Sequence, residues 1–149
     1  MRGRTQLAIL TVLASSVLSA PGVSMSHFPY GFIQNSCAPW DGPAIEITLT
    51  SESEQCKRTN GPYLKIGVWR GLPIHAGQKV KFGPSSQAGF ASRCSQRDNC
   101  ERAESGTIIF DEYQDRSGGQ GRYELHFKDD KTETGTFDVK WCENHFMCG

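Results

Sequence analysis

The aromatic residues Trp40, Tyr63 and Trp69 are the first candidates for chemistry in this sequence of 149 residues. Trp69 ends the alternating stretch 64–69, on the side opposite the aliphatic residues of that stretch. Exposed aromatic rings suit contacts with a protein or a glycan, because a rigid ring offers a large contact area at low entropic cost. The competing interpretation, which the pattern favours for Trp69, is burial beneath a second layer of the fold.

Arginines of the polar segment 83–105 form a second candidate group, Arg93, Arg97 and Arg102. Clustered arginines would provide a basic spot for an acidic partner. Acidic residues interleave with these arginines in the sequence, which favours a solvated loop of mixed charge. Arg93 and Arg97, together with the three aromatic residues, are the predicted binding residues.

The sequence contains no familiar motif for catalysis. The patterns Gly-x-Ser-x-Gly, His-Glu-x-x-His and Gly-x-x-x-x-Gly-Lys-Ser are all absent. An even number of cysteines also argues against a free nucleophilic thiol. The enzyme alternative is a small hydrolase whose acid and base meet only in the fold, with candidates at Asp111, Glu112, His126 and His145. We predict no catalytic residue and favour a function other than catalysis.

The C-terminal residues Cys142, His145, Met147 and Cys148 have side chains that suit zinc or copper. A copper site of this kind needs a second histidine well upstream, and the upstream histidines lie outside any supporting motif. A disulfide beside a surface histidine is therefore the favoured interpretation. The sequence predicts neither a metal nor a cofactor.

The first 24 residues have the three parts of a secretory signal peptide. Arg2 and Arg4 precede an uncharged apolar run at 7–18, and small residues follow between Ser19 and Ser26. The run is too short to span a bilayer, which takes about 20 residues, and no second apolar stretch follows it. We expect cleavage near residue 24, a mature chain without a membrane span, and a secreted or periplasmic location.

The charge balance argues against nucleic acid as a partner. The chain has 16 Lys+Arg and 16 Asp+Glu, so loss of Arg2 and Arg4 leaves 14 basic against 16 acidic side chains, a net charge of −2. Nucleic acids and anionic membranes attract proteins with an excess of positive charge. The predicted partner is therefore a protein or a glycan.

Six cysteines in an exported chain predict three disulfides. These cysteines are Cys37, Cys56, Cys94, Cys100, Cys142 and Cys148. Short spacing favours the pairs Cys94–Cys100 and Cys142–Cys148, and Cys37–Cys56 then follows by elimination. The main alternative joins Cys37 to Cys142 or Cys148, because the first and last strands of a sheet are often neighbours.

Alternation of apolar and polar residues with a period of two predicts six strands. They lie at 44–50, 64–69, 79–82, 106–113, 123–128 and 137–141. The last two face each other across a turn at 129–131 and predict a hairpin. Segment 25–43 is rich in aromatic residues and proline, so we expect an extended lead-in with little regular structure. Segment 83–105 is expected to be a long loop.

These elements predict an all-β fold, an antiparallel β-sandwich or small barrel of about six to seven strands. The fold is expected to be stabilised by disulfides, in a single domain at 44–149. A disulfide-held scaffold without a catalytic motif favours an exported binding module, with the 83–105 loop and the face of Trp69 as its surface. The alternatives are the small hydrolase and a structural component of an envelope or extracellular assembly.

Overall fold

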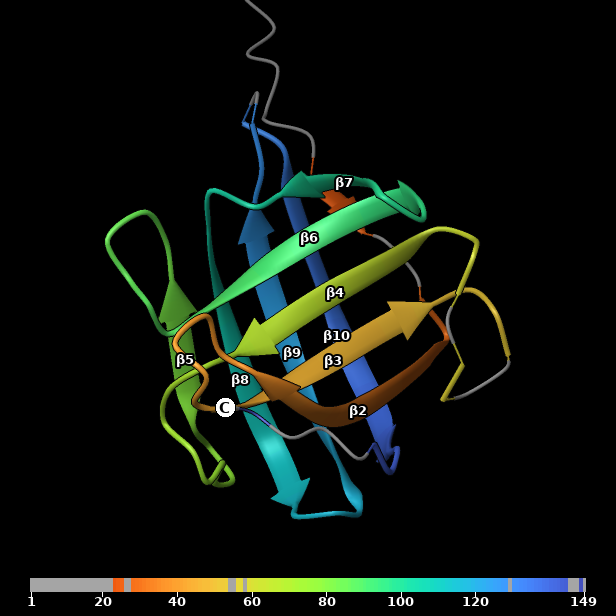
Figure 1. The fold of residues 1–149 in the computed structure, drawn as a ribbon. Coiled ribbons are helices and arrows are strands. Elements are labelled where there is room, and N and C mark those ends of the chain that lie inside the picture. The colour runs from red at the N-terminus through yellow and green to blue at the C-terminus, as the bar shows by residue number, and fades with distance from the viewer. Residues whose placement is uncertain are drawn as a thin grey trace, which may run out of the picture.

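The computed structural model describes residues 23–25, 28–53, 56–57, 59–128, 130–144 and 148. Within these residues the chain forms ten β-strands and no helix (Figure 1). The strands are β1 (Val23–Met25), β2 (Tyr30–Cys37), β3 (Pro43–Thr50), β4 (Tyr63–Val68), β5 (Lys79–Phe82), β6 (Gly89–Gln96), β7 (Asn99–Arg102), β8 (Ser105–Gln114), β9 (Gly118–His126) and β10 (Thr132–Trp141). No helix long and apolar enough to cross a membrane occurs in the described part of the chain. The predicted signal peptide lies outside the described residues, apart from its last two.

All ten strands belong to one mixed sheet. Its order is β5-β8-β9-β10-β2-β3-β4-β6-β7, with β1 paired to the start of β10. The β1–β10 and β10–β2 pairs are parallel, and the other pairs are antiparallel. The all-β class is therefore confirmed, whereas purely antiparallel pairing and a count of six to seven strands are wrong. The path ends at β5 and β7, which do not pair with each other among the described residues, so the sheet is not closed.

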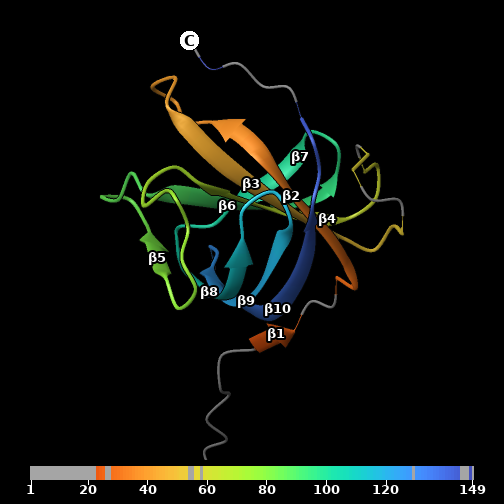
Figure 2. The same ribbon diagram turned by 90° about the horizontal axis from the view of Figure 1, so that it is seen from below.

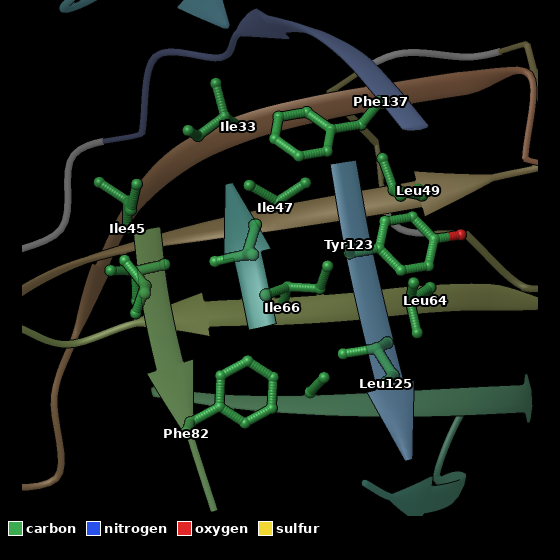
Figure 3. Close-up of a cluster of buried hydrophobic side chains, with 14 of the residues drawn as sticks. Ile33, Ile45, Ile47, Leu49, Leu64, Ile66, Phe82, Tyr123, Leu125 and Phe137 are labelled. Carbon is green, nitrogen blue, oxygen red and sulfur yellow. The ribbon is translucent and has the colours of Figure 1, made fainter. Parts of the chain in front are cut away.

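The sheet folds over so that its two halves face each other across one apolar core. Figures 1 and 2 show β2, β3, β4 and β6 crossing over β8, β9 and β10. Inward side chains from both halves meet in the core (Figure 3), including Ile33, Ile47, Leu49, Leu64, Ile66, Phe82, Tyr123, Leu125 and Phe137. Each large apolar side chain that leaves water in this way contributes about 1.5–3 kcal/mol. Residues of the opposite parity are more exposed along β8, β9 and β10, whereas Thr48 and Thr50 of β3 are also buried.

The expectation of little regular structure in 25–43 is wrong, because β2 lies in the middle of the sheet. It pairs with β3 along its whole length and with β10 at Phe32 and Ile33. The prolines of this segment flank β2, so its backbone donors remain available for pairing. Ile33 is fully buried. The segment is thus part of the core.

The expected loop at 83–105 instead contains the hairpin β6–β7. Ala91 of β6 lies opposite Ile66 of β4 and is fully buried. After β7 the chain turns a corner. There the Ala103 amide donates to the Ala91 carbonyl of β6, and the Glu104 amide donates to the His126 carbonyl of β9. This corner carries the chain from one half of the sheet to the other.

The disulfides are Cys37–Cys148, Cys56–Cys142 and Cys94–Cys100. The pair Cys94–Cys100 is confirmed, and its two residues lie directly opposite each other in the β6–β7 hairpin. The pairs Cys142–Cys148 and Cys37–Cys56 are wrong. Because β10 ends beside β2, the C-terminal segment reaches Cys37, as the alternative pairing predicted. Three disulfides are typical of proteins that fold in an oxidising compartment.

Candidate binding site

Three aromatic rings meet at the end of β4. Trp69, which follows β4, lies 5.3 Å from Phe90 of β6 between ring centroids, with planes tilted by 38°. Trp40 lies 6.1 Å from Trp69, with the two planes at 82°. Trp69 and Phe90 are half-buried, and Trp40 is 46% exposed. Trp40 and Trp69 thus lie together, with Phe90 as a third ring that was not among the sequence candidates.

Two glycines allow this packing. Gly67 of β4 pairs with Phe90, and a Cβ at Gly67 would lie 2.2 Å from the Phe90 ring. The ring therefore lies over β4 only because residue 67 lacks a side chain. A Cβ at Gly42 would similarly lie 2.5 Å from Nε1 of Trp40. The Phe90 and Trp40 rings thus each pack directly against the backbone of a glycine.

Two arginines lie over these rings. The Arg70 guanidinium carbon is 5.1 Å from the Trp40 centroid, and one guanidinium nitrogen donates to Oε1 of Gln87 at 3.0 Å. The Arg102 guanidinium carbon is 6.0 Å from the Trp69 ring and 5.7 Å from the Phe90 ring. A cation over an aromatic face is attracted by about 0.5–1 kcal/mol at exposed sites. We call Trp40, Trp69, Phe90, Arg70 and Arg102 the Trp–Arg cluster.

An open groove of about 650 Å³ runs beside the Trp–Arg cluster. It lies between the turn that follows β5 and the corner that follows β7. Its lining includes Trp69, Phe82, Gln87, Phe90, Arg102 and Glu104. Apolar rings therefore line a groove that also presents an amide, a guanidinium and a carboxylate. This combination is typical of sites that bury an apolar group and fix its orientation with a few polar contacts.

Tyr63 is not part of the cluster. It begins β4, whereas Trp69 follows the end of that strand. Six residues of extended chain separate the two by about 20 Å. The Tyr63 hydroxyl lies instead 3.7 Å from Sγ of Cys100.

The two predicted arginines also lie away from the cluster. Arg93 forms salt bridges with Glu101 at 2.8 Å and with Glu133 of β10 at 3.4 Å. Its guanidinium carbon is 4.5 Å from the Phe127 ring, so the side chain joins the two halves of the sheet. Arg97 is exposed in the turn between β6 and β7.

Sequence reasoning placed Arg102 in the candidate group with Arg93 and Arg97 but did not keep it as a predicted binding residue, and it did not consider Arg70, although a pattern for each was present. Arg70 directly follows Trp69 at the end of a predicted strand. The predicted Cys94–Cys100 disulfide, extended as an antiparallel hairpin, places Arg102 opposite Ser92 and thus next to Phe90. The pairing register of the hairpin is therefore what places Arg102 near Phe90.

The three candidate hydrolase residues that the structure describes do not form an acid–base site. Asp111 pairs with Arg122, and Glu112 is exposed near the end of β8. His126 lies at the far end of the β8–β9 pair, opposite Ser105. Its Nε2 is 3.0 Å from Oε1 of Glu124. His145 lies outside the described residues.

Of the four C-terminal metal candidates, the structure describes only the two cysteines. Cys142 and Cys148 are each bonded in a disulfide, to different partners. His145 and Met147 lie outside the described residues. The described part of the chain holds no group of three or more potential metal ligands.

No family model, curated protein or solved structure matches this chain.

Proposed function

We propose that this protein is an exported binding module that recognises a protein partner through the Trp–Arg cluster and the adjoining groove. The observation that carries the proposal is the meeting of three aromatic rings and two arginines, of which Trp69, Phe90 and Arg102 also line a groove. Trp and Arg are enriched among the residues that dominate protein–protein binding energy. The disulfides and the predicted signal peptide support export, and the folded sheet supplies a rigid, sandwich-like scaffold.

The angles between the rings favour a protein over a glycan. A sugar ring stacks best on an open, flat aromatic face. Here the Trp40 and Trp69 planes are at 82°, and Arg70 lies over the Trp40 ring. The rings and the groove therefore form a corner, which suits a side chain inserted from a partner.

The two other classes of function have less support. His126 lies at one end of the β8–β9 pair, opposite Ser105, and Asp111 lies six residues further along β8, which disfavours the hydrolase. An assembly through sheet edges would use β5 and β7, which are four residues each. Short edge strands resist edge-to-edge association, and the two exposed lysines of β5 add to this.

The test measures capture of partner material from the cells that export the protein. Immobilised mature protein is incubated with their extracellular or periplasmic fraction, either untreated, digested with protease, or oxidised with periodate to destroy glycans. We expect protease to abolish capture and periodate to leave it intact. Sensitivity to periodate alone would assign the site to a glycan and contradict the proposal.

Single substitutions test whether the Trp–Arg cluster is the binding site. Trp40→Ala should weaken capture by about 30-fold, the effect of truncating a residue that contributes about 2 kcal/mol. Tyr30→Ala is the matched control, because Tyr30 is 39% exposed and lies at the opposite end of the β2–β3 pair. Gly67→Ala should also weaken capture, since the new methyl group displaces the Phe90 ring. Equal losses in the Trp40 and Tyr30 variants would contradict the assignment to the Trp–Arg cluster.

A further inference from the structure

The arginines of the described chain fall into three groups. Arg93 and Arg122 form salt bridges with carboxylates. Arg97 and Arg116 lie in exposed turns between strands. The other two, Arg70 and Arg102, lie over aromatic rings. Among the described residues no carboxylate comes within salt-bridge distance of either.

A guanidinium held over a ring is prepared to bind a carboxylate. The ring fixes the plane of the guanidinium, and the N–H groups at its edge stay free to donate in that plane. A carboxylate accepts two such hydrogen bonds at once, in the plane of the guanidinium. A lysine ammonium acts as a point charge and imposes no such planar geometry. Arg70 uses one guanidinium nitrogen to bond Gln87. Within the part of the chain that the structure describes, the Arg102 guanidinium contacts only the Trp69 and Phe90 rings.

The groove beside Arg102 contains one opposing charge. Glu104 lines it at the corner after β7, and its side chain is exposed. Its carboxylate forms no salt bridge with the described residues. The floor near Phe90 and Phe82 is apolar. Arg102 and Glu104 thus lie on the same side of the groove, two residues apart at the corner that follows β7, beside an apolar floor.

We propose that the partner presents an acidic peptide segment, in which carboxylates bind Arg70 and Arg102 and an adjacent apolar side chain enters the groove beside Phe90. This inference rests on the proposed function and names the chemistry of its partner. Glu104 limits where the carboxylates of the segment bind, because it repels a carboxylate close to itself and accepts hydrogen bonds from a donor there. The complementary charge supplies specificity and speeds association.

The experiment uses the full mature chain and two synthetic peptides. In one, two glutamates flank a leucine within a glycine–serine background, and in the other glutamine replaces both glutamates. Binding is measured by fluorescence anisotropy of the labelled peptides. The three tryptophan indole N–H signals, observed by NMR, report the position of binding. We expect the glutamate peptide to bind about tenfold more tightly than the glutamine peptide. It should shift the signals of Trp40 and Trp69 but not that of Trp141.

Arginine variants separate this inference from general electrostatics. Arg70→Gln and Arg102→Gln should each reduce the preference for the glutamate peptide. Arg116→Gln removes the same charge from an exposed turn and should leave the preference unchanged. Thermal unfolding of each variant verifies that the fold is retained.

Each contrary outcome has a distinct meaning. Equal binding of the two peptides, with both dependent on Trp40, would overturn the acidic partner and leave protein recognition standing. If neither peptide binds, the inference is overturned, and the capture experiment with Trp40→Ala decides the proposed function separately. If a sulfated polysaccharide shifts Trp40 and Trp69 and the glutamate peptide does not, the site binds an anionic glycan, and both proposals fail.

Discussion

Replacement of Arg93 by methionine tests whether this arginine holds the fold together. Arg93 is one of the two arginines that the sequence suggested for binding, yet its guanidinium lies between Glu101 and Glu133. Glu133 is only 1% exposed and comes from the opposite half of the sheet. Methionine keeps much of the apolar stem of Arg93 while it removes the guanidinium, both ion pairs and the guanidinium's contact with the Phe127 ring. The variant therefore removes the polar contacts of Arg93 together.

The expected loss of stability follows from the geometry. Opposite charges at the 3.4 Å between Arg93 and Glu133 attract by about 5 kcal/mol at an effective dielectric constant of 20. Arg93 remains 31% exposed, so water weakens that attraction. Loss of one partner from a buried pair costs about 3–5 kcal/mol, because the other charge stays buried. We therefore expect Arg93→Met to lower the free energy of unfolding by about 2–3 kcal/mol.

Urea unfolding with the disulfides intact measures this loss. Arg97→Met is the matched control, and we expect a change within about 0.5 kcal/mol because Arg97 is exposed in a turn. A double-mutant cycle with Glu133→Gln should give a coupling energy of about 1–3 kcal/mol. Equal stability of the Arg93 and Arg97 variants, or a coupling energy near zero, would refute a structural role. Arg93 would then return as a binding candidate.

Two further predictions concern the disulfides and Tyr113. The Cys56–Cys142 disulfide joins residues 86 apart, and Cys94–Cys100 joins residues 6 apart. Chain entropy assigns them about 4.6 and about 2 kcal/mol. Replacing the longer bridge by alanines should therefore lower the urea midpoint more, and the reverse order would contradict this ranking. Burial, with a smaller contribution from Asp115, raises the pKa of Tyr113 above its ordinary value of 10.0. A raised pKa adds stability below pH 10 that is lost as pH rises through the folded value. Tyr113→Phe should therefore reduce the alkaline loss of stability, and Asp115→Asn should lower the pKa seen in a phenolate absorbance titration.

Strands with an obvious side-chain pattern were predictable from the sequence. β3 and β4 contain branched aliphatic residues at every second position, and both bury that side in the core. β6 carries small and polar residues, so its local preference for a strand is weak. Its pairing depends on β4, because Ala91 fits opposite Ile66. That contact joins residues 25 positions apart in the sequence, so no local pattern indicates it.

The disulfide pairing failed for a related reason. Short spacing predicts local bridges, and it succeeded for Cys94–Cys100, where a hairpin joins the two residues. The other bridges depend on the parallel contact between β10 and β2. Parallel neighbours require a long connection, so neither strand indicates the other in the sequence. Cys37 and Cys148 meet only because that contact forms.

The turn before β3 suggests why the Trp–Arg cluster is better explained by binding than by stability. Asp41 has a φ of 62°, a left-handed conformation that costs a residue with a side chain about 1 kcal/mol. The turn is closed by a hydrogen bond from the Ala38 amide to the Gly42 carbonyl, and it holds Trp40 against Trp69. Yet Trp40 stays 46% exposed, so it gains only part of the stabilisation that burial of a large ring provides. Local strain that fixes an exposed tryptophan contributes little to folding, but it does reduce the entropy that a binding partner would otherwise have to remove.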